Sequence, residues 1–141
     1  MKKVTYDASY GEKTSNIYEV NDIVWVIDNT VPWQEYAHGP VVRCLKVAAQ
    51  EWWEGNPYIP VYYDLVDPNT GEVVGVDGPG NHHFAEVFET EQKAIDELLF
   101  FVNDEIKFFE SEGTEYEEEE LKYEKYKKLR DHYNSQKEKN A

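Results

Sequence analysis

The sequence predicts an α+β fold in which a small curled antiparallel sheet of four or five strands is packed by a C-terminal helical hairpin. Two observations carry this prediction. Before residue 90, short β-rich apolar runs are separated by segments rich in Gly, Pro and Asn. From residue 91 onward, apolar residues recur at three- and four-residue spacing, which is the period of an amphipathic helix.

The length of 141 residues is that of a single domain. We divide it into an N-terminal extension at 1–16, the sheet at 17–89 and two helices at 90–133. The polar segment SQKEKNA near the C-terminus lacks apolar residues of a size that could anchor it, so 134–141 is expected to be a disordered tail.

The first strands are predicted from apolar runs. Residues 17–28 contain the run Val-Trp-Val-Ile at 24–27, which is typical of a central strand. The segment 29–40 has two prolines and a glycine and is expected to leave the sheet as a loop. A second strand is expected within 41–53, ending around Gln50.

A β-hairpin is the clearest local prediction. Two β-rich runs flank Asp67-Pro68-Asn69-Thr70-Gly71. Proline sets the φ of a turn position, and glycine accepts a positive φ at the end of the turn. The segment 84–89 is then expected to be the last strand.

Two helices follow. Thr90 is a suitable N-cap for the first, whose apolar stripe comprises Ile95, Leu98, Leu99, Val102, Ile106 and Phe109. Gly113 ends the connection, and Thr114 with Glu117 has the spacing of a capping box that opens the second helix. The second helix carries a tyrosine seam at heptad-like intervals, which we interpret as a candidate oligomer contact: Tyr116, Tyr123, Tyr126 and Tyr133.

The order of the runs IVWVIDN, GPVVRCLKVA, YYDLVDPNTGEVV and EVFETEQKAIDELLFF resembles small proteins of Gram-positive bacteria and their phages. The resemblance covers about residues 17–101 and implies an SH3-like β-barrel leading into a helix, with a phage or prophage origin and no attached activity. The chain departs from that pattern in the segments 29–40 and 50–60 and in its added acidic, tyrosine-rich helix.

Charge limits the classes of partner. The formal net charge is −15, and residues 86–120 alone carry 14 acids and 2 bases. Such a surface repels phosphate, so direct binding to nucleic acid or to anionic lipid is not expected. The chain has no long apolar run and a single cysteine, Cys44, so we expect a cytoplasmic protein without membrane contact, in the host cytoplasm if a phage encodes it.

The acidic segment and the loop aromatics define the predicted binding residues. Closely spaced carboxylates on a helix can imitate the phosphates of nucleic acid and attract a basic protein, although such a run is also typical of a solvated helix face. Tryptophan is enriched at binding hot spots, although these rings can equally seal the ends of a small sheet. The predicted partner-binding residues are Glu115, Glu117, Glu118, Glu119, Glu120, Trp33, Trp52 and Trp53.

The resulting hypothesis is a non-enzymatic acidic protein that inhibits a basic nucleic-acid-handling host protein, such as a defence nuclease. Two alternatives remain open: a homodimeric assembly module that uses the tyrosine seam, and a binder or hydrolase of a small molecule or nucleotide signal. The second would use the loop that carries His82 and His83, with His38, Asp77 and Glu86 as further metal-ligand candidates. We predict no catalytic residue, metal or cofactor, and a structural role for Cys44.

Overall fold

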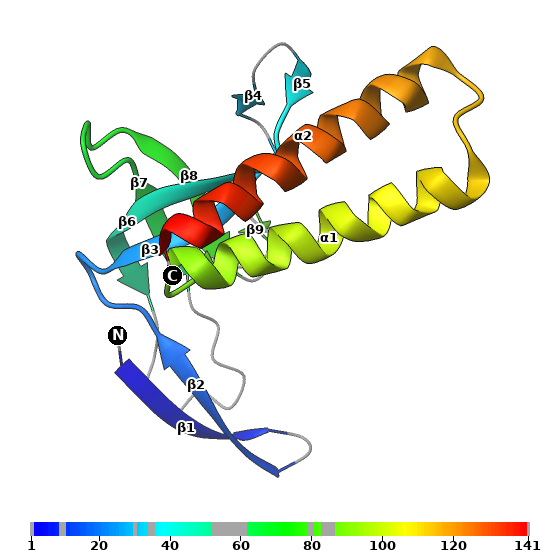
Figure 1. Cartoon of the computed structure of the whole chain (residues 1–141). Coiled ribbons are helices and arrows are strands. Elements are labelled where there is room, and N and C mark those ends of the chain that lie inside the picture. Colours follow the sequence, from blue (N-terminus) through cyan, green and yellow to red (C-terminus); the bar gives the residue numbers. More distant parts are fainter. Residues whose placement is uncertain are drawn as a thin grey trace. The chain divides into compact units, whose positions relative to one another are not determined.

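A computed structural model describes residues 2–8, 11–29, 31–33, 36–51, 62–78, 81–82 and 87–140. The chain divides into two compact units. The sheet unit comprises Met1–Val26 and Cys44–Glu89, and the helical unit comprises Ile27–Arg43 and Thr90–Ala141. The elements are labelled in Figure 1.

The main sheet is antiparallel and open, with the strand order β10-β3-β6-β7-β8-β9. Its strands are β10 (Val87–Phe88), β3 (Ile23–Asp28), β6 (Val41–Glu51), β7 (Tyr62–Val66), β8 (Val73–Gly78) and β9 (Asn81–His82). The antiparallel sheet followed by two helices confirms the α+β prediction. The predicted curling into an SH3-like barrel is wrong, because the two strands at the ends of the order span two residues each and do not close the sheet on one another.

The core of the sheet unit follows from strand alternation. Val24 and Val26 of β3, and Leu45 and Val47 of β6, are fully buried and occupy every second position of their strands. Leu65 of β7 completes this cluster. The two predicted strands at 17–28 and 41–53 are therefore confirmed, with the first beginning at residue 23.

The turn between β7 and β8 has the chemistry that its sequence predicts. The Asp67 side chain accepts hydrogen bonds from the N–H groups of Asn69 at 2.8 Å and Thr70 at 3.0 Å. The Gly71 N–H donates to the Asp67 carbonyl at 2.9 Å, and Gly71 has a φ of 74°. An L-residue rarely adopts this conformation, which explains the glycine.

Two small hairpins were not predicted. The N-terminal extension forms β1 (Lys2–Ala8) and β2 (Gly11–Ile17), which pair antiparallel with each other. The segment predicted to be a loop at 29–40 contains β4 (Pro32–Trp33) and β5 (Tyr36–His38). The segment does leave the main sheet, as its prolines predict, because β4 and β5 form a separate two-stranded sheet.

Helix α1 (Glu91–Glu112) is confirmed with its predicted ends. The Thr90 hydroxyl accepts from the Lys93 N–H at 3.2 Å, which is an N-cap. Gly113 has a φ of 78°, and its N–H donates to the Phe109 carbonyl at 2.8 Å. The six apolar residues of the predicted stripe are all buried, together with Ala94.

Helix α2 (Glu117–Asn140) differs from its prediction at both ends. It begins at Glu117, so Thr114 lies outside the helix, and the Tyr116 carbonyl accepts from the N–H groups of Glu119 and Glu120. The tail expected to be disordered at 134–141 is helical up to Asn140. None of the helices in the described ranges is long and apolar enough to cross a membrane.

Candidate interaction surface of the helical unit

Helices α1 and α2 pack side by side, as Figure 1 shows, and their shared core includes residues far away in the sequence. Trp33 lies in this core with Leu98, Val102 and Leu129. The partly buried side chains of Ile27, Val41 and Val42 pack against the same cluster. The helical hairpin is therefore built around the segment 27–43 of its own unit.

Two side chains of α2 bind this segment through hydrogen bonds. The Lys125 Nζ donates to the Gly39 carbonyl at 2.7 Å, and Lys125 is only 8% exposed. The Tyr133 hydroxyl accepts from the Val42 N–H at 2.8 Å. A β-carbon on Gly39 would collide with the Asp28 carbonyl oxygen and lie 2.9 Å from the Val41 nitrogen, so this close packing requires glycine.

Burial also changes the acidity of these groups. Desolvation lowers the pKa of Lys125, and the nearby charge of Lys122 lowers it further. Desolvation raises the pKa of the Tyr126 hydroxyl, with a smaller contribution from Glu105. It also raises the pKa of Tyr133, against the opposing effect of the Val42 hydrogen bond. These shifts are those of structural groups inside a core.

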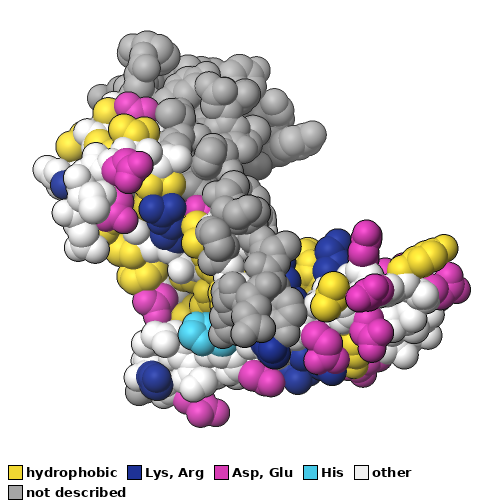
Figure 2. All heavy atoms as spheres, turned by 90° about the horizontal axis from the view of Figure 1, so that it is seen from above, with side chains coloured by type: hydrophobic (Ala, Val, Ile, Leu, Met, Phe, Trp, Pro, Cys, Tyr) yellow, Lys and Arg dark blue, Asp and Glu magenta, His cyan; other side chains and the backbone are white. Residues whose placement is uncertain are grey.

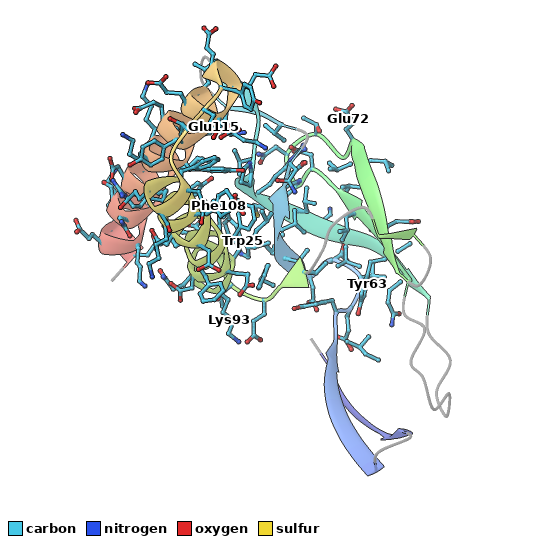
Figure 3. The ribbon with its side chains drawn as sticks, turned by 90° about the vertical axis from the view of Figure 1, so that its right-hand side faces the viewer. Trp25, Tyr63, Glu72, Lys93, Phe108 and Glu115 are labelled. Carbon is cyan, nitrogen blue, oxygen red and sulfur yellow. The ribbon has the colours of Figure 1, made fainter. Side chains whose placement is uncertain are left out.

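Carboxylates are concentrated at the end of α1, in the connection that follows it and in the first turn of α2. We call this group the acidic tip: Glu110, Glu112, Glu115, Glu117, Glu118, Glu119 and Glu120. All are exposed except Glu119, which is half-buried. Figure 2 shows acidic side chains at this end of the helical pair, and Figure 3 shows Glu115 at the turn.

The acidic tip is not neutralised locally. Within the described part of the chain, the ion pairs of the helical unit are Arg43–Asp28, Lys127–Glu124, Arg130–Asp131 and Lys137–Asp96, and none includes a glutamate of the tip. The first turn of α2 suits its four acids because the amide dipole there is positive. The tip is thus a locally stable concentration of charge.

Exposed aromatic rings accompany this charge, and the sequence argument did not single them out. On α1, Phe100 is 68% exposed and Phe108 is 57% exposed, and Phe101 is also exposed. Tyr116 and Leu121 are exposed at the tip. The sequence did hold a signal, because these three phenylalanines fall outside the buried stripe of α1, which includes the fourth, Phe109.

The structure separates the residues predicted to bind a partner. The five predicted glutamates lie together in the acidic tip. Trp33, in contrast, is 7% exposed and packs in the core of the helical unit, so it is not part of that unit's exposed surface. Trp52 and Trp53 lie outside the described residues, and their binding role stays a prediction.

The four tyrosines of the predicted seam also differ from one another in their burial. Tyr126 and Tyr133 are buried within their own unit, where Tyr126 stacks on Phe109 with 6.4 Å between ring centroids. Tyr123 is half-buried, and Tyr116 is exposed. Tyr126 and Tyr133 therefore hold α2 on its own unit, and a role of the seam in a homodimer stays a prediction.

The alternative chemistry at the histidines stays a prediction as well. The side chains of His38, Asp77, His82, His83 and Glu86 lie outside those that the structure describes. Among the described residues, no group of three or more His, Cys, Asp or Glu side chains could hold a metal ion. Cys44, the only cysteine, is half-buried.

Comparison with known proteins adds no relative: no family model, no curated protein and no solved structure matches this chain. The helical unit is therefore interpreted from its own chemistry. Its described surface combines unneutralised carboxylates, which attract cationic groups, with exposed aromatic rings, a residue type that is enriched in protein interfaces.

Proposed function

We propose that this protein is a non-enzymatic interaction protein whose acidic tip binds a basic, nucleic-acid-handling protein and blocks its phosphate-binding surface. The observation that supports the proposal most directly is a group of seven glutamates over residues 110–120, six of them exposed, without an ion pair among the described residues. The proposed inhibition of a host defence nuclease is the specific form of this function.

The physical basis is electrostatic. A surface with several uncompensated carboxylates attracts cationic partners over distances comparable to the Debye length, which is about 10 Å at 0.1 M salt. The closely spaced carboxylates at the end of α1 and in the first turn of α2 also offer a series of anionic oxygens to Lys and Arg side chains, as a phosphate backbone does. The partner that fits this chemistry best is a protein that normally binds nucleic acid.

Affinity capture at low salt tests the proposal. Immobilised protein is exposed to host lysate, eluted with a salt step and compared with a variant in which Glu115, Glu117, Glu118, Glu119 and Glu120 are replaced by Gln. We expect nucleic-acid-binding proteins to elute as salt rises to about 0.3 M, because exposed charges are then screened. The amount of these proteins captured by the glutamine variant should be lower than the amount captured by the unchanged protein by a factor of about ten or more.

A matched control separates the tip from overall charge. It carries amide substitutions at five other acids and so has the same net charge: Asp64, Glu72, Glu124, Asp131 and Glu138. This control should bind like the unchanged protein. The captured partner should also lose duplex DNA when the protein is added. Equal binding by both variants, or a partner that binds DNA and this protein together, would contradict the proposal.

A further inference from the structure

The exposed side of α1 carries three phenylalanines in a regular arrangement. Phe101 and Phe108 are separated by seven residues, which is two helical turns, so they lie in one line along the helix, whereas Phe100 lies about 100° around the helix from Phe101, at the other edge of the exposed face. We call Phe100, Phe101 and Phe108 the phenylalanine stripe. Figure 3 shows Phe108 on α1.

Packing within the unit does not account for the stripe. Phe101 and Phe108 make edge-to-face contacts with Tyr126 and Phe109, with ring centroids 6.0 and 5.8 Å apart, but Phe101 stays 45% exposed and Phe108 57% exposed. Among the described residues, Phe100 makes no ring contact at all. Exposed rings of this size leave apolar surface in water, which is unfavourable and which a partner would cover.

Acids lie between and beside the rings. Glu97 precedes Phe100 by three residues and Phe101 by four, and Asp104 lies between Phe101 and Phe108 at three- and four-residue spacing. Both acids are exposed. Helix α1 as a whole has seven acids and two bases. The exposed face of α1 therefore carries the two acids between Phe100 at one edge and Phe101 with Phe108 at the other.

We infer that the phenylalanine stripe with Glu97 and Asp104 is a docking surface for a basic amphipathic helix of the partner, whose apolar side chains cover the rings and whose Lys and Arg side chains pair with the acids. This inference rests on the proposed function, which supplies a basic partner, and it adds where and in which conformation that partner binds. From Glu97 to Phe108 the surface is about 16 Å long, which corresponds to three turns of a helix.

The net charge of this protein favours a different protein, and not a second copy of this chain, as the molecule that covers the phenylalanine stripe. Residues 121–140 of α2 carry seven bases and three acids and are the only strongly basic segment of this chain, but each copy has a net charge of −15. Bringing two such copies together adds repulsion between their acidic tips. A cationic partner has no such penalty.

Two synthetic peptides test the inference by fluorescence anisotropy. One has about 18 residues of Leu and Lys with Leu at helical spacing, and the other has Ser in place of every Leu with the same number of Lys. The leucine peptide should bind the unchanged protein at least about tenfold more tightly. Phe100→Ser with Phe108→Ser should abolish this advantage, while Phe101 is kept because its ring contacts Tyr126.

The control is Val73→Ser, which changes an apolar side chain of similar exposure, 67%, in the sheet unit and should leave both affinities unchanged. Equal binding of the two peptides, or an unchanged leucine advantage in the double phenylalanine variant, would overturn the inference alone. Binding of neither peptide would overturn the proposed function as well. A dimer in sedimentation velocity that the phenylalanine substitutions dissociate would make a second copy the occupant and overturn the inference.

Discussion

At the scale of single residues, two polar side chains of α2 attach this helix to the segment 27–43 through hydrogen bonds. Tyr133 and Lys125 each bond to a backbone atom about 90 residues earlier in the chain, namely the Val42 nitrogen and the Gly39 oxygen. Such bonds contribute modestly when made, but leaving a buried partner without one is costly. Both residues therefore act as specific connectors between the helix and the segment 27–43.

Tyr133→Phe should lower the free energy of unfolding by about 1–2 kcal/mol, because the Val42 N–H loses its acceptor while the ring still fills its site. Urea denaturation followed by tyrosine and tryptophan fluorescence measures the change. Tyr116→Phe is the matched control, since Tyr116 is 67% exposed, and should be neutral. A neutral Tyr133→Phe would mean that water replaces the hydroxyl.

At the scale of elements, the two helices are joined near the N-terminus of α1 and the C-terminus of α2. The Glu91 carboxylate accepts hydrogen bonds from Asn140 at 2.8 Å and from Gln136 at 3.2 Å. Lys137 forms an ion pair with Asp96 at 2.9 Å, and this contact lowers the pKa of Asp96. These contacts stabilise the helical conformation of the polar C-terminal segment, which its own composition does not favour.

Gln136→Ala combined with Asn140→Ala should therefore loosen the last turns of α2 and the first turn of α1. We expect faster amide hydrogen exchange there and a loss of stability of about 1 kcal/mol or less, because the bonds are largely exposed. Ser135→Ala with Glu138→Ala serves as the control, since both side chains are exposed on the same turns. Equal rates of amide hydrogen exchange in the two variants would show that the last turns of α2 are stable without the Glu91 contacts.

At the scale of the whole molecule, net charge sets the response to salt. A charge of −15 destabilises the folded state by repulsion between its acids. Raising NaCl from about 0.01 M to about 0.5 M shortens the Debye length from roughly 30 Å to a few ångströms. The urea midpoint should therefore rise with salt at neutral pH.

Replacing the five glutamates Glu115, Glu117, Glu118, Glu119 and Glu120 by Gln changes the net charge from −15 to −10 and should reduce this salt effect. The comparison of urea midpoints at the two salt concentrations, with and without the substitutions, measures the contribution of the acidic tip. A midpoint that falls as salt rises would indicate that ion pairs such as Lys137–Asp96 outweigh the repulsion.

The success of the sequence-based predictions depended on the range of the interactions involved. The Asp67–Gly71 turn, the Thr90 cap, the Gly113 end and the buried stripe of α1 were all predicted correctly, because each is specified by residues a few positions apart. The five glutamates of the predicted site also lie together, because they are neighbours in the chain. Closure into a barrel was predicted wrongly, because it depends on how far the edge strands extend and pair.

The amino-acid sequence by itself determined the fold class, the main turn, the ends of α1 and the concentration of acids near residue 115, since these follow from local conformational preference, periodicity and charge. Only the tertiary structure decided which aromatic residues outside a periodic pattern are buried. Trp33 is buried because residues of α1 and α2 that are distant in the sequence pack around it, whereas Phe108 is exposed as its position outside the apolar stripe of α1 indicates.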